Sequence, residues 1–236
     1  MSKKLSIYLA FLIMCTNTIA SVQLIPRKVL FGNPDNASPL ISPDGKKLAY
    51  LAPEKGVLNI WVRTLGKSDD QVVTNDIKGG IHTFDWQEGS QYIHYLQDAD
   101  GNENYHLYQT NLETRNTRDF TPFSAAKVFS TITESRFPEI MLVGLNIRDP
   151  RFEDIYRLNL KTGALELDTQ NPGDVASWQA DNELNIRAAE IATADGGTLI
   201  RVRLSKKSLW KDFIKFGSDE TVQLIGFSPD NKKLRL

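Results

Sequence analysis

The sequence contains three histidines, which follow one another at equal intervals of 12 residues. These are His82, His94 and His106. Imidazole is a common zinc ligand, so the regular spacing raises the question of a metal site. The strand pattern, however, places His82 in the innermost strand of a predicted four-stranded unit, His94 in the next strand and His106 in the third. Because these positions do not converge on one ion, we interpret the three as surface or core histidines.

A second group of potential metal ligands lies in the acidic segment 97–104, which reads Gln-Asp-Ala-Asp-Gly-Asn-Glu-Asn. Closely spaced acids of this kind are typical of calcium-binding loops. Counted from Asp98, an EF-hand-like loop requires glycine at its sixth position and a carboxylate at its twelfth. The sequence has Glu103 and Gln109 at those positions. We therefore interpret the segment as a solvated hairpin loop.

Thiol chemistry depends on Cys15, the one cysteine of the sequence. It lies in an N-terminal segment in which Lys3 and Lys4 precede an apolar run over residues 5–15, and Ala20 then offers a small residue for cleavage. This layout is typical of a secretory signal peptide. A run of about 11 apolar residues is shorter than the roughly 20 that span a bilayer, which argues against a membrane anchor.

We therefore expect a signal peptide over residues 1–20 and a mature domain over residues 21–236. A lipoprotein signal, the alternative role of Cys15, is disfavoured because the bulky Met14 stands where a small residue is usual. The mature chain would have no thiol, hence no disulfide, cysteine nucleophile or thiolate metal site. Charged residues make up 24% and hydrophobic residues 41% of the sequence. These values indicate neither disorder nor a basic surface for nucleic acid.

The elements that must position any site are indicated by the stretch 38–50, which predicts strand, turn and strand. Pro43 presets a turn dihedral, Asp44 can bond neighbouring amides, and Gly45 can adopt positive φ. The pattern returns at 226–234, where Asn231 replaces Gly45, a substitution that the left-handed conformation tolerates.

Ser42 and Ser228 are 186 residues apart, which fits four intervals of about 46.5 residues. Degraded copies of the pattern lie between them, at 84–95, 138–143 and 177–184. A four-stranded propeller blade takes roughly 40 to 50 residues. We therefore predict an all-β fold, an incomplete β-propeller of four-stranded antiparallel blades with about four blades and the first hairpin of a fifth.

The predicted blades follow an extended lead-in over residues 22–34. The first blade has strands at 40–41, 48–52, 58–63 and 71–74; the second runs over 81–123, the third over 127–170, and the fourth has strands at 175–178, 184–189, 198–204 and 210–216. Residues 234–236 align with residues 48–50, so we expect the chain to stop inside the second strand of a blade. Such a hairpin would expose strand edges and apolar faces.

Aromatic residues recur at equivalent positions of the predicted blades. Trp61, Tyr108 and Tyr156 occupy the third strands, where we expect packing between blades rather than ligand stacking. Trp86 and Trp178 lie near the ends of inner strands, where packing is again expected and a place on a central channel is the alternative.

A charged segment of the third blade corresponds in position to the acidic loop of the second. It comprises Arg148 and residues 149–151, Asp-Pro-Arg. These charges are candidates for pairing with a partner domain or a peptide terminus. We expect a solvated turn instead, as for most surface loops.

Several segments together resemble exported serine peptidases of the prolyl oligopeptidase superfamily, on the acylaminoacyl-peptidase and dipeptidyl-peptidase side. The segments are 25–34 (IPRKVLFGNP), 37–45 (ASPLISPDG), 59–63 (NIWVR), 95–98 (YLQD), 103–108 (ENYHLY), 143–146 (VGLN) and 226–230 (GFSPD). The resemblance covers nearly all of the mature chain. The Ser-Pro-Asp turns occur in many propellers, whereas the opening decapeptide is more specific.

The resemblance implies a propeller that sits over an α/β-hydrolase domain, admits oligopeptides and shapes the substrate entrance. The hydrolase domain of such enzymes carries a Gly-x-Ser-x-Gly elbow followed by Asp and His. No Gly-x-Ser-x-Gly occurs in this sequence. We therefore assign no catalytic, cofactor-binding or metal-binding residue and expect no cofactor.

The predicted function is that of a non-catalytic, substrate-gating part of such a peptidase, inactive alone and located in the periplasm or outside the cell. The expected partners are an α/β-hydrolase domain and, by analogy, peptide substrates, with no nucleic acid and no membrane after signal cleavage. The alternative is a stand-alone binding propeller like the periplasmic TolB-type modules, which would bind a protein or peptide.

Overall fold

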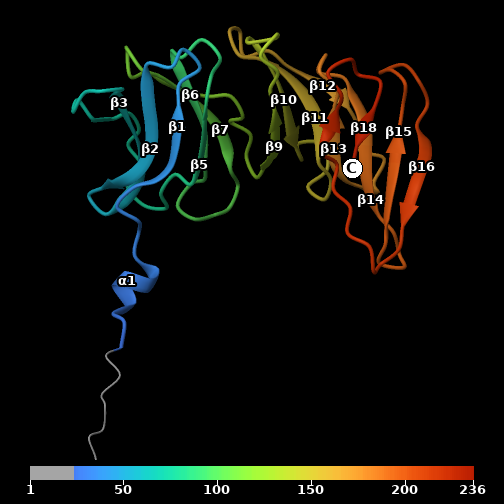
Figure 1. Cartoon of the computed structure of the whole chain (residues 1–236), viewed down its shortest axis with the longest axis horizontal. Helices are drawn as coiled ribbons and strands as arrows, with labels where there is room; N and C mark the ends of the chain where they lie inside the picture. Colours follow the sequence, from blue (N-terminus) through green and yellow to red (C-terminus); the bar gives the residue numbers. More distant parts are fainter. Residues whose placement is uncertain (1–23) are drawn as a thin grey trace, which may run out of the picture. The chain divides into compact units, whose positions relative to one another are not determined.

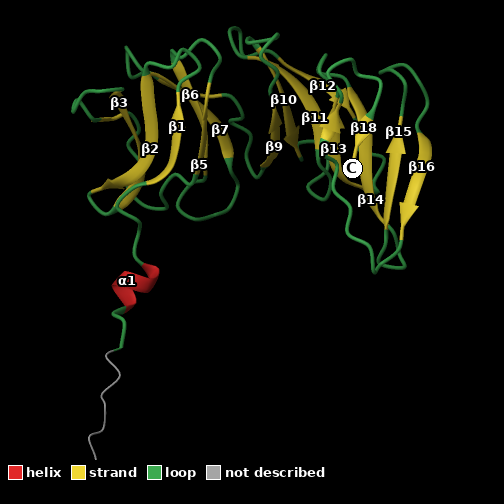
Figure 2. Ribbon diagram, viewed as in Figure 1, coloured by secondary structure: helices red, strands yellow, loops and turns green. Residues whose placement is uncertain are grey.

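The computed structural model describes residues 24–236 and consists almost entirely of antiparallel β-sheet (Figures 1 and 2). Residues 33–236 form one compact unit. Within it, four four-stranded sheets are followed by one two-stranded sheet, and in every sheet the strands pair in sequence order. This confirms the predicted succession of four units and a final hairpin.

The strand bounds agree with the predicted blades to within a few residues. The first sheet has β1 (Ala37–Ile41), β2 (Lys47–Glu54), β3 (Val57–Thr64) and β4 (Gln71–Val72); the second has β5 (Thr83–Trp86), β6 (Tyr92–Gln97), β7 (His106–Asn111) and β8 (Thr117–Asp119); the third has β9 (Val128–Ile132), β10 (Ile140–Leu145), β11 (Asp154–Asn159) and β12 (Leu165–Thr169); the fourth has β13 (Val175–Ala180), β14 (Ile186–Ala192), β15 (Thr198–Val202) and β16 (Lys211–Phe216); the fifth has β17 (Gly226–Phe227) and β18 (Leu234–Arg235).

The turn between β1 and β2 is built by the residue types that predicted it. The Ser42 hydroxyl donates to Oδ1 of Asp44 at 2.6 Å and accepts the amide of Lys47 at 2.9 Å. The bond from Ser42 is the main reason that the pKa of Asp44 lies below its ordinary value. Gly45 adopts φ of 68°, in the left-handed region that other residues resist.

The turn between β17 and β18 repeats this geometry with different residues. The Ser228 hydroxyl donates to Asp230 at 2.6 Å and accepts the amide of Lys233 at 2.9 Å. Asn231 takes φ of 58° at the place of Gly45, as predicted. Both hairpins therefore depend on a hydroxyl that bridges a carboxylate and the returning strand.

The outer turns of the second and third sheets are also copies of each other. Asn111 caps two following amides with its side-chain oxygen and accepts the amide of Arg115 on its backbone carbonyl at 2.9 Å. Asn159 caps in the same way and accepts the amide of Gly163 at 2.7 Å. Arg115 and Gly163 have φ of 62° and 80°. The outer turns thus share the repeat of the inner hairpins.

Three apolar cores hold consecutive sheets together. The first core joins sheets one and two, the second joins sheets two and three, and the third joins sheets three and four. On β10, Met141 and Val143 point into the second core while Leu142 points into the third. Because alternate residues of a strand point to opposite faces, one strand supplies two cores.

The strands of the first and last sheets pair only locally. Within residues 24–236, β1 pairs with β2 and β18 pairs with β17, and none of the three cores combines the first sheet with the fourth. The expectation of an inner hairpin in a fifth unit agrees with this topology.

The prediction of an extended lead-in over residues 22–34 is wrong for its central part. Residues 27–31 form α1 (Arg27–Phe31), with the amides of Val29 and Leu30 bonded to the carbonyl of Pro26 at 2.8 and 3.3 Å. Proline is well suited to a helix start, because its φ is already helical and its missing N–H costs no bond there. This helix does not belong to the compact unit of residues 33–236.

The predicted signal peptide, residues 1–20, lies outside the described residues. Among residues 24–236, no helix is both long and apolar enough to cross a membrane.

Candidate functional site

Antiparallel pairing brings two kinds of turn to the same end of each sheet. Successive strands run in opposite directions, so the turn after the first strand and the turn after the third lie at the same end. We call this end of the sheets the turn face. It comprises the inner turns 42–46, 87–91, 133–139, 181–185 and 228–233 and the outer turns 65–70, 112–116, 160–164 and 203–210.

Inner turns of successive sheets are hydrogen-bonded to one another along the turn face. The bonds run from the amide of Asp44 to Oγ of Ser90 at 3.1 Å, from Nε2 of Gln87 to the carbonyl of Pro138 at 3.3 Å, from Nη2 of Arg136 to the carbonyl of Asn182, and from the amide of Asn182 to Oδ1 of Asn231 at 2.9 Å. These bonds fix each sheet relative to the next at the turn face.

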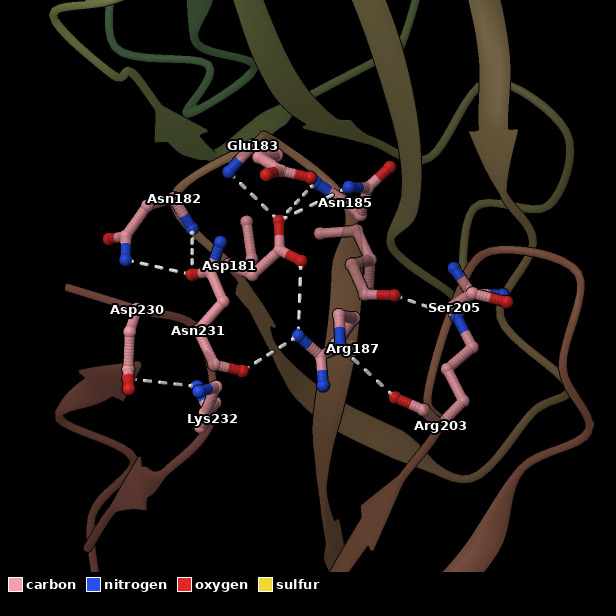
Figure 3. Close-up of polar contacts among 12 residues, drawn as sticks. Asp181, Asn182, Glu183, Asn185, Arg187, Arg203, Ser205, Asp230, Asn231 and Lys232 are labelled. Carbon is pink, nitrogen blue, oxygen red and sulfur yellow. Dashed lines mark hydrogen bonds and ion pairs between the residues drawn. The ribbon is translucent and has the colours of Figure 1, made fainter. Parts of the chain in front are cut away.

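Figure 3 shows how the last of these junctions is held. Oδ1 of Asp181 accepts the amides of Glu183 and Asn185, both at 3.0 Å, while Oδ2 lies 3.3 Å from Nη1 of Arg187. The same nitrogen donates to the carbonyl of Asn231 at 3.1 Å. A hollow of about 400 Å³ opens beside this network. The groups that hold the fifth sheet therefore already have protein partners.

A hollow of the turn face lies between the second and third sheets, and we call it the amide groove. It measures about 770 Å³. Its lining is rich in side-chain amides and hydroxyls and comprises Gln87, Gly89, Gln91, Tyr92, Gln109, Asn111, Thr114, Asn116, Thr117, Arg118, Glu139, Leu160 and Lys161. Uncharged hydrogen-bonding groups outnumber charged ones, so the groove suits a neutral polar ligand.

Gln109, which lines the amide groove, belongs to a buried pair of neutral side chains. Nε2 of Gln109 lies 2.9 Å from Nε2 of His94, and His94 is only 5% exposed. Burial lowers the pKa of His94 to about 4, because the charged imidazolium would lose its hydration. The pair is therefore uncharged at neutral pH.

The structure places the three histidines in separate environments. His82 is exposed, lies one residue before β5 instead of within an inner strand, and contacts the carbonyl of Gly79 at 3.2 Å. His106 pairs through Nδ1 with Oδ2 of Asp119 at 2.8 Å. Over residues 24–236, no group of three or more His, Cys, Asp or Glu side chains could hold a metal ion.

The pair of His106 and Asp119 resembles two members of a hydrolytic triad, an imidazole oriented by a carboxylate. A nucleophilic hydroxyl bonded to the second ring nitrogen would complete it. Among the described residues, the hydrogen bond of the His106 ring goes to Asp119, and its face stacks on Tyr108 at 6.3 Å between centroids. The arrangement positions strands β7 and β8 and offers no nucleophile.

The acidic loop 97–104 is held by its own side chains. Oδ2 of Asp98 accepts the amide of Glu103 at 2.8 Å, and Oδ1 of Asn102 accepts the amide of Asn104 at 3.0 Å. Asp100 forms an ion pair of 2.7 Å with Lys78, which lies between β4 and β5. These carboxylates and amides turn toward protein groups, in agreement with a hairpin loop.

Two of the three repeated aromatics pack between sheets as predicted. Tyr108 packs against the core between sheets one and two, and Tyr156 against the core between sheets two and three. Tyr108 also stacks on Tyr95 with 5.5 Å between ring centroids. Trp61 is half-buried and donates to the carbonyl of Ala52 at 3.2 Å.

The two inner-strand tryptophans are buried and bonded to backbone carbonyls. Trp86 is 8% exposed and donates to the carbonyl of Leu40 at 3.0 Å, which links the second sheet to the first. Trp178 is 9% exposed and donates to the carbonyl of Glu153 at 3.1 Å. Both rings serve packing rather than a channel surface.

The charged side chains of residues 148–151, which were candidates for contacts with a partner, bind other residues of this chain. Arg148 binds both carboxylate oxygens of the fully buried Asp154 at 2.7 and 3.0 Å and also the carbonyl of Asn171 at 3.2 Å. Arg151 binds Asp149 at 2.8 and 3.0 Å, and these bonds lower the pKa of Asp149 to about 2. Arg148 thus holds β11 in place, and this segment has no free charge pair for a partner.

A stack of four-stranded antiparallel sheets with shared cores defines the class of the protein as a β-propeller module. No protein-family model matches the chain. Its sequence is 35% identical over 219 residues to dipeptidyl aminopeptidase BIII of Pseudoxanthomonas mexicana, a match that covers 92% of this chain and 32% of that protein. It is 29% identical over 217 residues to dipeptidyl peptidase family member 6 of Caenorhabditis elegans, covering 85% of this chain and 29% of that protein.

Solved structures support the same fold. TolB from Acinetobacter baumannii is similar with a TM-score of 0.52 and 19% identity, over 84% of this chain and 47% of that chain. Prolyl oligopeptidase B from Galerina marginata is similar with a TM-score of 0.56 and 16% identity, over 80% and 28%. The chain spans about a third of the length of the curated relatives. It is homologous to the propeller portion of dipeptidyl peptidases, which confirms the resemblance to the prolyl oligopeptidase superfamily.

Proposed function

We propose that this chain is the non-catalytic, substrate-gating propeller portion of an exported serine peptidase of the prolyl oligopeptidase type. The observation that carries the proposal is the match to dipeptidyl aminopeptidase BIII, which covers 92% of this chain and only 32% of that protein. The matched portion folds into sheets rather than into the α/β-hydrolase domain expected to carry the chemistry. The export assignment rests on the composition of residues 1–20.

The chemistry that a serine peptidase needs supports the proposal that the chain itself does not hydrolyse peptides. The serine must be exposed on a strained elbow and must give its proton to an imidazole. The sequence has no Gly-x-Ser-x-Gly, and within residues 24–236 no hydroxyl is bonded to the ring of His106, which pairs with Asp119. Peptide hydrolysis would therefore belong to a hydrolase domain that this portion serves.

The close packing of the stacked sheets supports the proposed gating role. Residues of the three cores such as Ile60, Val143 and Ile186 are 0% exposed, and the inner turns are bonded from sheet to sheet. A wall of this kind would admit short extended peptides to a catalytic domain and exclude folded proteins. Peptide substrates and a hydrolase domain are thus the proposed partners.

The first test measures turnover of aminoacyl and dipeptidyl p-nitroanilides by the full chain. We expect none above the buffer rate. Turnover that a serine-reactive inhibitor abolishes would contradict the proposal.

The second test replaces the matching 219 residues of the Pseudoxanthomonas mexicana enzyme with this chain. We expect the chimera to cleave dipeptidyl substrates and to discriminate against long peptides and folded proteins, as a gating part would. A chimera that folds and cleaves without size discrimination would contradict the gating role. Translation of the DNA downstream of Leu236 in all three frames checks independently for further blades and a Gly-x-Ser-x-Gly elbow.

The alternative function is that of a stand-alone binding module, which the fold likeness to TolB from Acinetobacter baumannii supports. Such a module would be a monodisperse monomer with a specific protein or peptide ligand. Sedimentation of the full chain distinguishes the two, because exposed strand edges and apolar faces favour self-association. A compact, stable monomer would favour the binding module.

A further inference from the structure

We propose that the amide groove between the second and third sheets is a binding site for an extended, uncharged peptide segment. The inference deepens the proposed function and rests on it for the choice of peptides as ligands. It concerns one groove between two adjacent sheets, whereas gating concerns passage toward a hydrolase domain.

The groove offers hydrogen-bonding groups that the protein itself does not use. Within residues 24–236, the side chains of Gln91 and Asn116 and the hydroxyl of Tyr92 form no hydrogen bond, although all three line the groove. A side-chain amide presents donors and an acceptor together. An extended peptide likewise presents one N–H and one C=O per residue. The two sets are complementary without any charge.

The groove is open because of one residue position. Gln109 on β7 occupies the place that Arg157 occupies on β11, since each lies directly after the repeated tyrosine of its strand. Arg157 crosses to the next sheet and binds the carbonyl of Leu184 and Oδ2 of Asp168. Gln109 is shorter and is directed toward His94. Sheets two and three are consequently left with a hollow of about 770 Å³ between them.

The charged residues of the groove lie at its border with the third sheet. The guanidinium of Arg118 donates to the carbonyls of Lys161 and Thr162, at 3.4 and 2.8 Å, and stacks on Phe120 at 4.8 Å. Its charge is therefore engaged with the backbone of the outer turn. Lys161 and Glu139 have opposite signs, and the remaining positive charge, that of Arg118, is bonded to these carbonyls.

The lining favours peptide over carbohydrate. Tyr92 is the only aromatic residue among the described residues that line the groove, and it is half-buried. Sugar sites depend on broad aromatic faces against which the pyranose ring stacks, and this groove has no such platform. Its volume lies within the roughly 300–1,000 Å³ of ordinary ligand pockets.

The experiment measures fluorescence anisotropy of a labelled octapeptide of Ser, Thr and Ala, acetylated and amidated at its ends, with the full chain. We expect saturable binding that Gln91→Ala combined with Asn116→Ala weakens at least fivefold and that Tyr92→Phe weakens about threefold. Gln170→Ala, an exposed amide after β12 and outside the groove, is the matched control and should bind as the unmodified chain does. Thermal unfolding by circular dichroism verifies that each variant is folded.

Three outcomes would overturn the proposal: no saturable binding of the peptide, equal binding by the folded double variant, or displacement of the peptide by maltohexaose at lower concentration than by unlabelled peptide. The last would identify the groove as a carbohydrate site. Peptide binding that depends on Gln91 and Asn116 would stand even if the chimera showed no size discrimination. The groove and the gating role can therefore fail separately.

Discussion

The interface between the second and third sheets and the interface between the third and fourth solve the same packing problem with different residues. The first leaves the mostly uncharged amide groove beside Gln109, which contacts the buried and neutral His94. The second is crossed by charged side chains, with Arg157 and Lys206 both bound to Asp168, at 3.2 and 2.6 Å. The repeat therefore specifies the sheets, while single positions decide whether an interface is hollow or filled.

The charged interface depends on a carboxylate that has no access to water. The side chain of Asp168 is 0% exposed, and burial alone would raise its pKa. Bonds from Lys206 and Thr169 and the charge of Arg157 reverse this and lower the pKa below its ordinary value. Nearby, Arg203 is 9% exposed and donates to Thr169 at 2.9 Å, which joins the fourth sheet to the third.

The largest effect is expected from Asp168→Ala, which removes the shared acceptor of the charged interface. Breaking a buried ion pair leaves an uncompensated charge and typically costs about 3–5 kcal/mol. We expect a loss near the lower end of this range in the free energy of unfolding, measured with urea, because Arg157 and Lys206 are partly exposed. Glu166→Ala, an exposed acid on the same strand, should change it by less than about 0.5 kcal/mol. Equal effects of the two substitutions would remove the distinction between the interfaces.

The neutral interface should be the one sensitive to mild acid. Since the pKa of His94 is lowered to about 4 in the folded chain, the unfolded chain binds a proton between pH ~6.5 and ~4 that the folded chain does not. Stability should therefore fall as pH drops through this window, by up to about 3 kcal/mol. Glu88 and Glu134 line a second, smaller hollow beside the ring, and burial is the cause of the lowered pKa of His94.

Urea unfolding from pH 7 to pH 4.5 measures this dependence. His94→Asn should flatten it, whereas His82→Asn, at an exposed histidine, should leave it unchanged. A His94→Asn variant with the original slope would assign the acid sensitivity elsewhere.

Arg157→Gln would convert the charged interface toward the neutral one. It removes the bonds to Asp168 and to the carbonyl of Leu184, which should cost about 2 kcal/mol, because hydrogen bonds to charged groups contribute roughly 1.5–3 kcal/mol each and Lys206 still pairs with Asp168. Arg151→Gln, at an exposed arginine of the same sheet, is the control and should cost under about 0.5 kcal/mol. If Arg157→Gln left the free energy of unfolding in urea unchanged, the length of the side chain at position 157 would not be what fills the interface.

The smallest effect concerns the outer turn that Arg118 covers. A methyl group at position 163 would collide with the Arg118 guanidinium, and φ of 80° is unfavourable for alanine. At Gly45, with φ of 68°, a methyl group would meet open space. Gly45→Ala should cost about 1 kcal/mol, and Gly163→Ala a few tenths more, as the collision adds to the strain. Identical thermal unfolding of the two variants would mean that Arg118 does not constrain the turn.

The sequence predicted the parts of the fold that depend on local chemistry. Gly45 and Asn231 both adopt positive φ, and the outer turns that end in Arg115 and Gly163 have the same backbone hydrogen bond. These conformations depend on residues within four or five positions of one another. The helix after Pro26 was missed because proline favours extended chain and helix starts alike.

The amide groove was not predictable, because the pairing of Gln109 with His94 depends on strand register. The two residues are 15 positions apart and meet only when β6 and β7 align. One other repeated hydrogen bond can be recognised in the sequence. The hydroxyls of Thr74 and Thr121 accept the amides of Ile60 and Leu107, both at 2.9 Å, and each threonine lies two residues after the fourth strand of its sheet. The two threonines are 47 residues apart, so the repeat extends to these bonds.

Strand β10 contributes side chains to two cores, which should make its local unfolding unfavourable. Releasing this strand would hydrate the apolar residues that face both neighbouring sheets, whereas an outer strand such as β16 has five exposed residues of six and a single partner. Amide protons of Leu142 and Val143 should thus be the last to exchange with deuterated solvent, and those of the outer strands among the first. The middle of the chain would act as the anchor from which the flanking sheets fray.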